Sequence, residues 1–263
     1  MDLAILFWFY KESEICENRL KLLKKYNPNL KIYGFYGGEI SEADKYKNKL
    51  CKYLDDFYIF TANTDEDWKW INGDLMILDW YEKRGQNLKW DSIIVVQWDM
   101  LVFDSLIDQF SGMKKDEIFI SAVREIDDLI ESKWDWVKIG SKERQNYLNF
   151  LNYVKKKYEY KDKPLGSLFI LEILPRTYLE KYLMVEDKEV GMLEYKTPIY
   201  AQIFGIPFYQ KDIGIIWYAT EKQTPLNAIP KEIPEDYIKK QLAENSGWRI
   251  FHPYYKIWPM PIE

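Results

Sequence analysis

Asp99 has the residue type and the setting of a ligand for a hard metal cation. It ends the run Asp91-Ser-Ile-Ile-Val-Val-Gln-Trp-Asp99, the strongest strand signal of the chain, and a second apolar run over residues 100–103 follows it. A carboxylate at the end of a buried strand can bind Mg²⁺ or Mn²⁺ against substrate phosphates. The alternative is an aspartate that only forms a turn or caps a helix.

His252 is the only histidine of the chain, and it lies in the segment Arg249-Ile-Phe-His-Pro-Tyr-Tyr-Lys256 beyond the last expected helix. A solitary histidine is more often a packed or surface residue than a metal ligand. By itself, the segment leaves both interpretations open.

Glu194 is a candidate acid–base residue because it stands just before Thr197-Pro198, a typical N-cap and first-turn pair. This pair predicts a helix over residues 198–204. In the simpler interpretation, Glu194 is a surface acid that complements the helix dipole. Asp187 and Glu189 are close enough in sequence to compete with it for any catalytic role.

Three further residues, Asp74, Phe9 and Tyr10, could contact a ligand. Asn72 and Asp74 interrupt an aromatic, apolar helix expected over residues 65–83, and Phe9 and Tyr10 end the first strand. Core packing explains most of the aromatic residues equally well.

The elements that must position these residues alternate between strand and helix. Strands are expected over residues 3–10, 30–36, 57–61 and 91–99, and helices over 13–26, 45–55 and 65–83. This order predicts an α/β fold with a mostly parallel sheet flanked by helices, which binds ligands at the carboxyl ends of its strands. Tyr10, Gly37 and Asp99 should share that edge.

The second half of the chain has a looser pattern. We expect helices over residues 141–158, 175–182, 198–204 and 235–245, and strands over 167–171 and 214–218. No repeat or Gly/Ser-rich linker marks a boundary, so residues 1–263 are expected to form a single domain.

Composition narrows the classes of partner. The formal net charge of -5 argues against nucleic acid as the main partner. No apolar run approaches the roughly 20 residues of a membrane-spanning helix, which leaves only peripheral membrane contact. Cys16 and Cys51 both lie in helical patterns, as expected for free thiols in a reducing compartment such as the cytoplasm.

The segment Ser92-Ile-Ile-Val-Val-Gln-Trp-Asp-Met-Leu-Val resembles the metal-binding strand of glycosyltransferases with the A-type (GT-A) fold. Their motif is usually Asp-x-Asp. Here Gln97 replaces the first acid, and Asp99 matches the last. The resemblance implies a Rossmann-like, nucleotide-sugar-binding domain in which residues 1–125 bind the donor and 126–263 form the acceptor side. It also implies that Asp99 and a C-terminal histidine, His252, hold Mn²⁺ or Mg²⁺.

The same resemblance implies the remaining roles. The donor would be a nucleoside-diphosphate sugar, and Lys256 would neutralise the departing diphosphate. Glu194 would be the general base that activates an acceptor hydroxyl of a glycan, lipid or protein, with inversion at the anomeric carbon. The donor pocket would be lined by Phe9, Tyr10, Asp74, Gln97 and Trp98.

Two alternatives remain open at this point. A nucleotidyltransferase also combines a parallel sheet with an acid-bound metal, but Tyr10-Lys-Glu-Ser lacks the Gly-rich, basic first loop such enzymes usually have. A non-catalytic carbohydrate- or nucleotide-binding protein could have kept the fold and lost the reaction, which Gln97 makes credible. Dinucleotide-binding, Walker and Cys-x-x-Cys motifs are absent from the sequence.

Overall fold

The computed structural model describes residues 1–218 and 222–260, and its centre is a six-stranded sheet in the order β3-β2-β1-β4-β9-β6. Two-stranded pairs β10-β5 and β7-β8 accompany it. The strands are β1 (Leu3–Phe9), β2 (Lys31–Tyr36), β3 (Asp56–Ile59), β4 (Ser92–Gln97), β5 (Leu101–Val102), β6 (Phe119–Ile120), β7 (Arg124–Glu125), β8 (Leu165–Gly166), β9 (Glu172–Pro175) and β10 (Ile250–Phe251).

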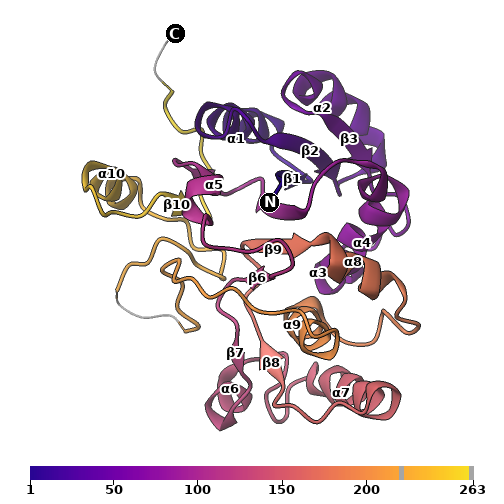
Figure 1. Cartoon of the computed structure of the whole chain (residues 1–263). Helices are drawn as coiled ribbons and strands as arrows, with labels where there is room; N and C mark the ends of the chain where they lie inside the picture. The colour runs from indigo at the N-terminus through magenta and orange to yellow at the C-terminus, as the bar shows by residue number, and fades with distance from the viewer. Residues whose placement is uncertain (219–221, 261–263) are drawn as a thin grey trace.

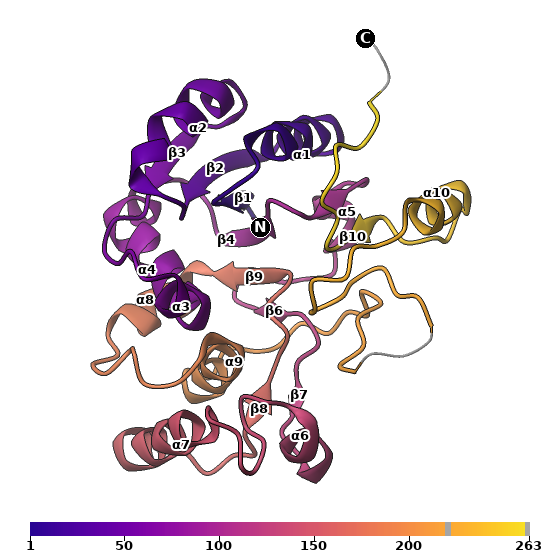
Figure 2. The ribbon, with the colours of Figure 1, turned by 180° about the vertical axis from the view of Figure 1, so that it is seen from behind.

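Helices connect these strands and cover the sheet (Figures 1 and 2). The α-helices are α1 (Ser13–Tyr26), α2 (Ala43–Leu50), α3 (Glu66–Ile71), α4 (Gly73–Lys83), α5 (Leu106–Gln109), α6 (Asp128–Lys133), α7 (Arg144–Tyr158), α8 (Arg176–Leu183), α9 (Leu193–Ile203) and α10 (Glu235–Ala243). Short 3₁₀ turns are η1 (Ile40–Glu42), η2 (Cys51–Tyr53) and η3 (Gly85–Asn87). None of the helices in the described ranges is long and apolar enough to span a membrane.

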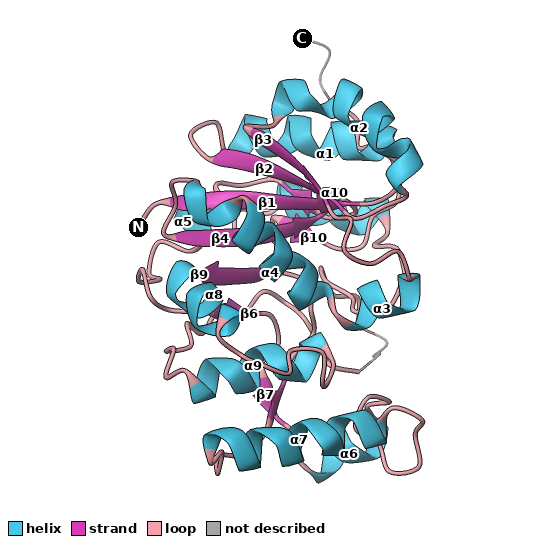
Figure 3. Cartoon of the chain, turned by 90° about the vertical axis from the view of Figure 1, so that its right-hand side faces the viewer, coloured by secondary structure: helices cyan, strands magenta, loops and turns pink. Residues whose placement is uncertain are grey.

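The first four strands of the sheet are parallel, as the alternating pattern predicts. β1 lies between β2 and β4, with Phe9 opposite Tyr36 and Trp8 opposite Gln97. β9 then pairs antiparallel with both β4 and β6. The carboxyl ends of β1, β2 and β4 therefore meet at one edge of the sheet (Figure 3). Tyr10 and Gly37 directly follow β1 and β2, and Asp99 lies two residues after the end of β4.

Alternate residues of β1 explain why helices are needed on both faces. Ile5, Phe7 and Phe9 pack in one buried cluster with apolar residues of α1 and α2. Ala4 and Leu6 pack in another with residues of α4, α8 and α9. Since successive side chains of a strand point to opposite faces, a strand that is apolar throughout must be covered on both.

Four expected elements differ from the structure. The predicted helix over 65–83 is broken at Asn72 into α3 and α4. Residues 167–171 form turns, and the strand begins afterwards at Glu172. α9 begins at Leu193, five residues before Pro198, so Glu194 lies in its first turn. Within 214–218, only an isolated bridge from Ile215 to Leu226 forms. The division of the chain into donor and acceptor parts stays a prediction.

Candidate metal and acid–base site

A short antiparallel pair brings His252 to Asp99. In the β10-β5 pair, Phe251 lies opposite Leu101, so the chain after β10 runs alongside the chain before β5. The backbone N–H of Tyr254 donates to the carbonyl of Asp99 at 2.8 Å, which continues this register. The pairing therefore explains why two residues far apart in sequence meet beyond the end of β4.

The two side chains face each other in a nearly buried position. Nε2 of His252 lies 3.3 Å from Oδ1 of Asp99, and the side chains are 11% and 10% exposed. Nδ1 of His252 lies 3.0 Å from the carbonyl oxygen of Asn227. Because a carbonyl only accepts, we infer that Nδ1 carries the proton in the neutral ring and that Nε2 presents a lone pair to Asp99.

This arrangement leaves two electron-pair donors without a proton between them. Oδ1 of Asp99 is buried and makes no hydrogen bond. A buried, unpaired carboxylate oxygen is costly unless a cation or a donor satisfies it. Carboxylate oxygen and imidazole nitrogen are both ligands of Mn²⁺, and a backbone carbonyl on the far ring nitrogen is the usual orienting contact of a metal-bound histidine. The residues present therefore fit a divalent cation.

Within the described ranges, no group of three or more His, Cys, Asp or Glu side chains forms a closed metal cage. Two protein ligands suit Mg²⁺- or Mn²⁺-type sites in which substrate phosphates and water supply the remaining oxygens. An open site of this kind can hold a cation against a ligand.

Backbone contacts fix the histidine and its neighbours. The N–H of His252 donates to the carbonyl of Pro225, and the N–H of Asn227 donates back to the carbonyl of His252, at 3.0 and 2.8 Å. The segment around Leu226 thus forms a short parallel bridge beside His252. This bridge explains why the carbonyl of Asn227 is within reach of the imidazole.

Arg19 of α1 holds the C-terminal segment, and the sequence analysis missed it. Its guanidinium is almost fully buried and donates to the carbonyls of Tyr254 and Lys256 at 2.7 and 2.8 Å. Burial lowers the pKa of Arg19 to about 10, and the negative charge of Asp99 opposes that shift. The available signal was position: Arg19 falls on the apolar stripe of α1 that also contains Ile15 and Leu23.

Aromatic rings surround the Asp99 end of β4. Trp98 is 3% exposed, and its ring lies edge-on to Tyr10 and stacked on Tyr255, with centroids 5.9 Å away in both cases. The ammonium of Lys11 lies 5.1 Å from the Trp98 ring centroid. Tyr10 is 45% exposed, so its ring is the accessible part of this cluster.

Phe9 and Lys256, both predicted to contact the donor, already pack or pair with other residues of the protein. Phe9 is fully buried among Tyr36, Tyr46 and Phe57, which opposes contact of its ring with a bound base, and its donor contact stays a prediction. The ammonium of Lys256 is ion-paired with Glu232 on the surface. Its role with diphosphate stays a prediction.

Gln97 connects the end of β4 to Glu194 through the backbone of one residue, Phe169. Its Nε2 donates to the carbonyl of Phe169 at 3.0 Å, and the N–H of Phe169 donates to Oε1 of Glu194 at 2.9 Å. The amide of Gln97 is thus occupied in holding the turn segment 167–171. In this structure Nε2 of Gln97 stabilises that turn segment. The contact of Gln97 with a ligand stays a prediction.

Glu194 has the electrostatics of a weak base. Its side chain is only partly exposed, and burial raises its pKa to about 7, while the hydrogen bond from Phe169 opposes the rise. Burial and the neighbouring Glu194 raise the pKa of Glu172 well above its ordinary value. Glu172 is fully buried, and its Oε2 makes no hydrogen bond. The sequence analysis did not select Glu172, which is a single acid within the apolar run of residues 170–174.

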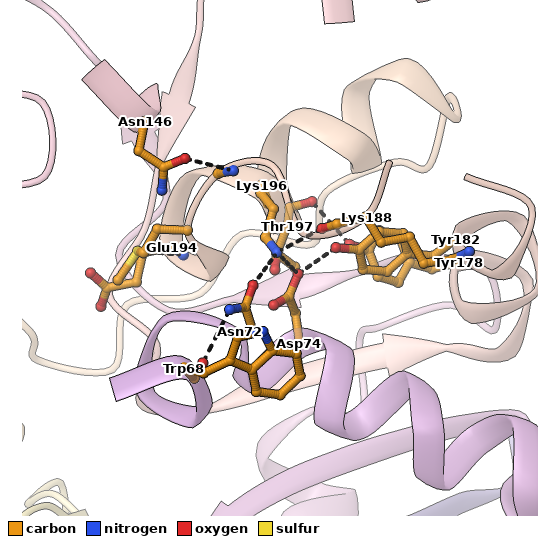
Figure 4. Close-up of polar contacts among 12 residues, drawn as sticks. Trp68, Asn72, Asp74, Asn146, Tyr178, Tyr182, Lys188, Glu194, Lys196 and Thr197 are labelled. Carbon is orange, nitrogen blue, oxygen red and sulfur yellow. Dashed lines mark hydrogen bonds and ion pairs between the residues drawn. The ribbon is translucent and has the colours of Figure 1, made fainter. Parts of the chain in front are cut away.

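Asp74 lies in a buried polar cluster with Lys196, Asn72 and Tyr182, apart from Glu194 (Figure 4). Its Oδ2 lies 3.1 Å from Nζ of Lys196 and accepts a hydrogen bond from Tyr182. Lys196 also donates to Oδ1 of Asn72 and to the carbonyl of Lys188, at 3.2 and 3.0 Å. The 5% exposed carboxylate of Asp74 therefore balances a buried lysine, a structural task that opposes the donor contact predicted for it.

Glu194 points away from that cluster, on the other side of the first turn of α9 (Figure 4). Its rivals Asp187 and Glu189 are exposed and lie in the loop that also supplies the carbonyl of Lys188 to Lys196. Glu194 is the one of these three acids that accepts a hydrogen bond from the turn segment held by Gln97.

No family model matches the chain, and no curated protein matches it in sequence. Glycosyltransferases are among the solved structures similar to it, as the resemblance predicted. They include bifunctional WbbM, with 10% identity over 95% of this chain and 45% of that chain at TM-score 0.45. Mouse xyloside xylosyltransferase 1 has 13% identity over 81% of this chain and 85% of that chain at TM-score 0.39.

A third similar structure is the mannosyltransferase PcManGT from Pyrobaculum calidifontis in complex with GDP-Man and Mn²⁺, with 11% identity over 80% of this chain and 54% of that chain at TM-score 0.43. This chain therefore spans less than two thirds of the WbbM and PcManGT chains. At these identities and TM-scores, the function has to be inferred from the residues of the site.

Proposed function

We propose that this protein is a metal-dependent glycosyltransferase that moves a sugar from a nucleoside-diphosphate sugar to an acceptor hydroxyl. The observation that carries the proposal is the contact of Oδ1 of Asp99 with Nε2 of His252 at 3.3 Å, together with the carbonyl oxygen of Asn227 at 3.0 Å from Nδ1, which favours the tautomer whose Nε2 lone pair faces Asp99. The Asp99–His252 pair lies at the carboxyl edge of the parallel strands, which is the edge where α/β folds of this kind bind nucleotides.

Asp99 and His252 would hold Mn²⁺ or Mg²⁺ against the donor diphosphate, together with water. When bound, the cation supplies Lewis-acid stabilisation of the negative charge on the departing diphosphate. Tyr10 offers an exposed ring next to this position for contact with the donor. Arg19 keeps the chain after His252 against α1, so that the ligand pair does not separate.

Glu194 would act as the general base. A carboxyl group with a pKa of about 7 is ionised in a large fraction of molecules at neutral pH and still has useful basicity. The N–H of Phe169 fixes one carboxylate oxygen, which leaves the other to accept the proton of the acceptor hydroxyl. If this base acts on the face opposite the leaving diphosphate, the configuration at the anomeric carbon inverts.

The test is a screen of nucleotide sugars with Mn²⁺, in which ¹H NMR follows the anomeric proton of the product. We expect release of a nucleoside diphosphate with the sugar transferred and inverted, and loss of this reaction in Asp99→Asn. The exposed Asp108 on α5 supplies the matched control, because Asp108→Asn removes the same charge away from the site. Release of pyrophosphate from a nucleoside triphosphate and a sugar phosphate would instead assign nucleotidyl transfer. Absence of both reactions, with saccharide or nucleotide binding retained, would assign the non-catalytic alternative.

A further inference from the structure

An open hollow of about 470 Å³ lies at the carboxyl end of β6, outside the metal and acid–base residues. Its volume falls in the range of roughly 300–1,000 Å³ typical of small-molecule sites. The wall is formed by the chain following β6 and by a segment from the C-terminal half. The lining residues are Ala122, Val123, Arg124, Glu125, Asp127, Ile215 and Trp217.

The walls of the hollow belong to segments that adjoin both halves of the site. β7, on one wall, pairs with β8, and the next residue, Ser167, donates from its N–H and its hydroxyl to the carbonyl of Glu194 at 2.8 and 2.7 Å. Ile215, on the other wall, bridges Leu226, which bridges His252. A molecule bound in this hollow would therefore lie against elements that position the proposed base and the proposed metal ligand.

Trp217 forms a rigid aromatic wall. Its Nε1 donates to the carbonyl of Ala122 at 2.7 Å, and Trp134 packs edge-on against it with ring centroids 5.0 Å apart. The ring remains partly exposed. An indole held on its polar edge and on one side is preorganised, so a ligand that packs on it does not have to fix its rotamer first.

The polar lining is rich in hydrogen-bonding atoms but nearly balanced in charge. Arg124 is paired with Asp127 at 2.8 Å, and Glu125 is paired with Lys163 at 2.8 Å. These guanidinium and carboxylate groups still have free donor and acceptor positions. A lining of this kind suits a neutral molecule with many hydroxyls better than an anion, which would have to compete with the carboxylates for Arg124.

The backbone at the floor of the hollow is strained. Ala122 has a φ of 55°, in the left-handed region that residues with a side chain rarely adopt. The carbonyl of this residue accepts the hydrogen bond that fixes Trp217. Strain that persists because surrounding contacts hold it is characteristic of ligand-binding positions.

We propose that this hollow binds the acceptor, and that the acceptor is a neutral saccharide whose ring packs on Trp217 while its hydroxyls bond to Arg124 and the neighbouring carboxylates. A sugar ring presents an apolar C–H face together with a polar rim, which matches an aromatic wall bordered by paired charged groups. The identity of this site as the acceptor site rests on the proposed function, but saccharide binding by itself does not.

The experiment measures binding of neutral methyl glycosides and disaccharides to the whole protein without metal or nucleotide, by saturation-transfer NMR and calorimetry. We expect at least one of these probes to bind, and Trp217→Ala and Arg124→Met each to raise its Kd at least about tenfold. Two matched controls lie elsewhere. Trp70→Ala removes a 70% exposed tryptophan, and Arg84→Met removes an arginine paired with Asp56. Both controls should bind like the wild type.

If Trp217→Ala does not fold, Arg124→Met decides, because it keeps an unbranched apolar stem and removes the guanidinium, and the Arg84→Met control accounts for the loss of a surface ion pair. Failure of every neutral saccharide to bind the wild type, equal binding by Arg124→Met, or tighter binding of a methyl glucuronide than of the methyl glucoside would overturn the proposal. Nucleoside diphosphate and Mn²⁺ are titrated separately. If nucleoside diphosphate and Mn²⁺ bind but no saccharide does, only the inferred saccharide site is refuted. If a saccharide binds but nucleoside diphosphate and Mn²⁺ do not, only the proposed donor chemistry is refuted.

Discussion

The buried ion pair between Lys196 and Asp74 gives a prediction about stability that does not depend on the proposed function. The two side chains are 0% and 5% exposed, and Nζ of Lys196 makes contacts of 3.1, 3.2 and 3.0 Å with Asp74, Asn72 and the carbonyl of Lys188. Together these contacts join the first turn of α9 to the start of α4. Lys196→Met removes the cation and leaves the carboxylate of Asp74 buried with only the hydroxyl of Tyr182.

The expected cost follows from that uncompensated charge. Removing one partner of a buried pair typically costs about 3–5 kcal/mol of unfolding free energy, because the remaining charge keeps its desolvation penalty. Oδ1 of Asp74 already lacks a hydrogen bond, so no local donor is in place to reduce the cost. The double variant Lys196→Met/Asp74→Leu removes both charges and should recover more than half of the loss.

Urea unfolding followed by circular dichroism measures these differences. The exposed pair Lys157–Glu186 supplies the control, because Lys157→Met removes the same kind of charge at the surface and should leave the midpoint unchanged. A Lys196→Met variant within about 1 kcal/mol of wild type would refute the reasoning, as would a double variant no more stable than Lys196→Met.

Further predictions concern Glu194 and Arg19. Activity should rise with pH through about 7 as the carboxyl group of Glu194 loses its proton. Glu194→Gln should abolish this rise and lower turnover about 10²–10⁴-fold, whereas Asp187→Asn and Glu189→Gln should not. Full activity of Glu194→Gln, with loss of activity in either of the other two variants, would reassign the base. Since the folded pKa of Glu194 lies above its unfolded value, the unfolded chain binds fewer protons between these two values, so stability falls as pH rises through that window. Urea midpoints from about pH 4 to about pH 8 should show less of this fall in Glu194→Gln. Arg19→Met leaves the carbonyls of Tyr254 and Lys256 without their donor and should cost at least about 2 kcal/mol in the same assay; wild-type stability would contradict this.

The sequence predicts the first four strands of the fold well because their pattern is strong and local. β1 and β4 are apolar throughout, as strands covered on both faces must be, and the end of β4 identifies Asp99. Residue types typical of a helix N-terminus predicted the start of α9 less accurately. Thr197-Pro198 looks like a helix start, yet α9 begins at Leu193 and includes Pro198. The missing N–H of Pro198 leaves the carbonyl of Glu194 without its intrahelical donor, and the N–H and hydroxyl of Ser167 bond to that carbonyl instead.

The remaining features depend on contacts between distant segments. The β10-β5 pair contains only two residues per strand, too few for a periodic signal, yet it helps to bring His252 beside Asp99. The sequence pattern looks like one continuous helix, but Asn72 ends α3, and its side-chain oxygen accepts a hydrogen bond from Lys196 of α9. The buried position of Arg19 requires a partner segment at the other end of the chain. Tertiary contacts of this kind override local preference and cannot be derived from spacing.

The central claim is that Asp99 and His252 together bind a divalent cation, and the most direct test is calorimetric titration of Mn²⁺ in the presence of a nucleoside diphosphate. Wild type and Asp108→Asn should bind the nucleotide only with metal, and Asp99→Asn and His252→Ala should each weaken that binding at least about tenfold with the fold intact, since even orienting residues around a metal typically contribute 10–100-fold. A titration of Asp99→Asn or His252→Ala that matches wild type would contradict the account.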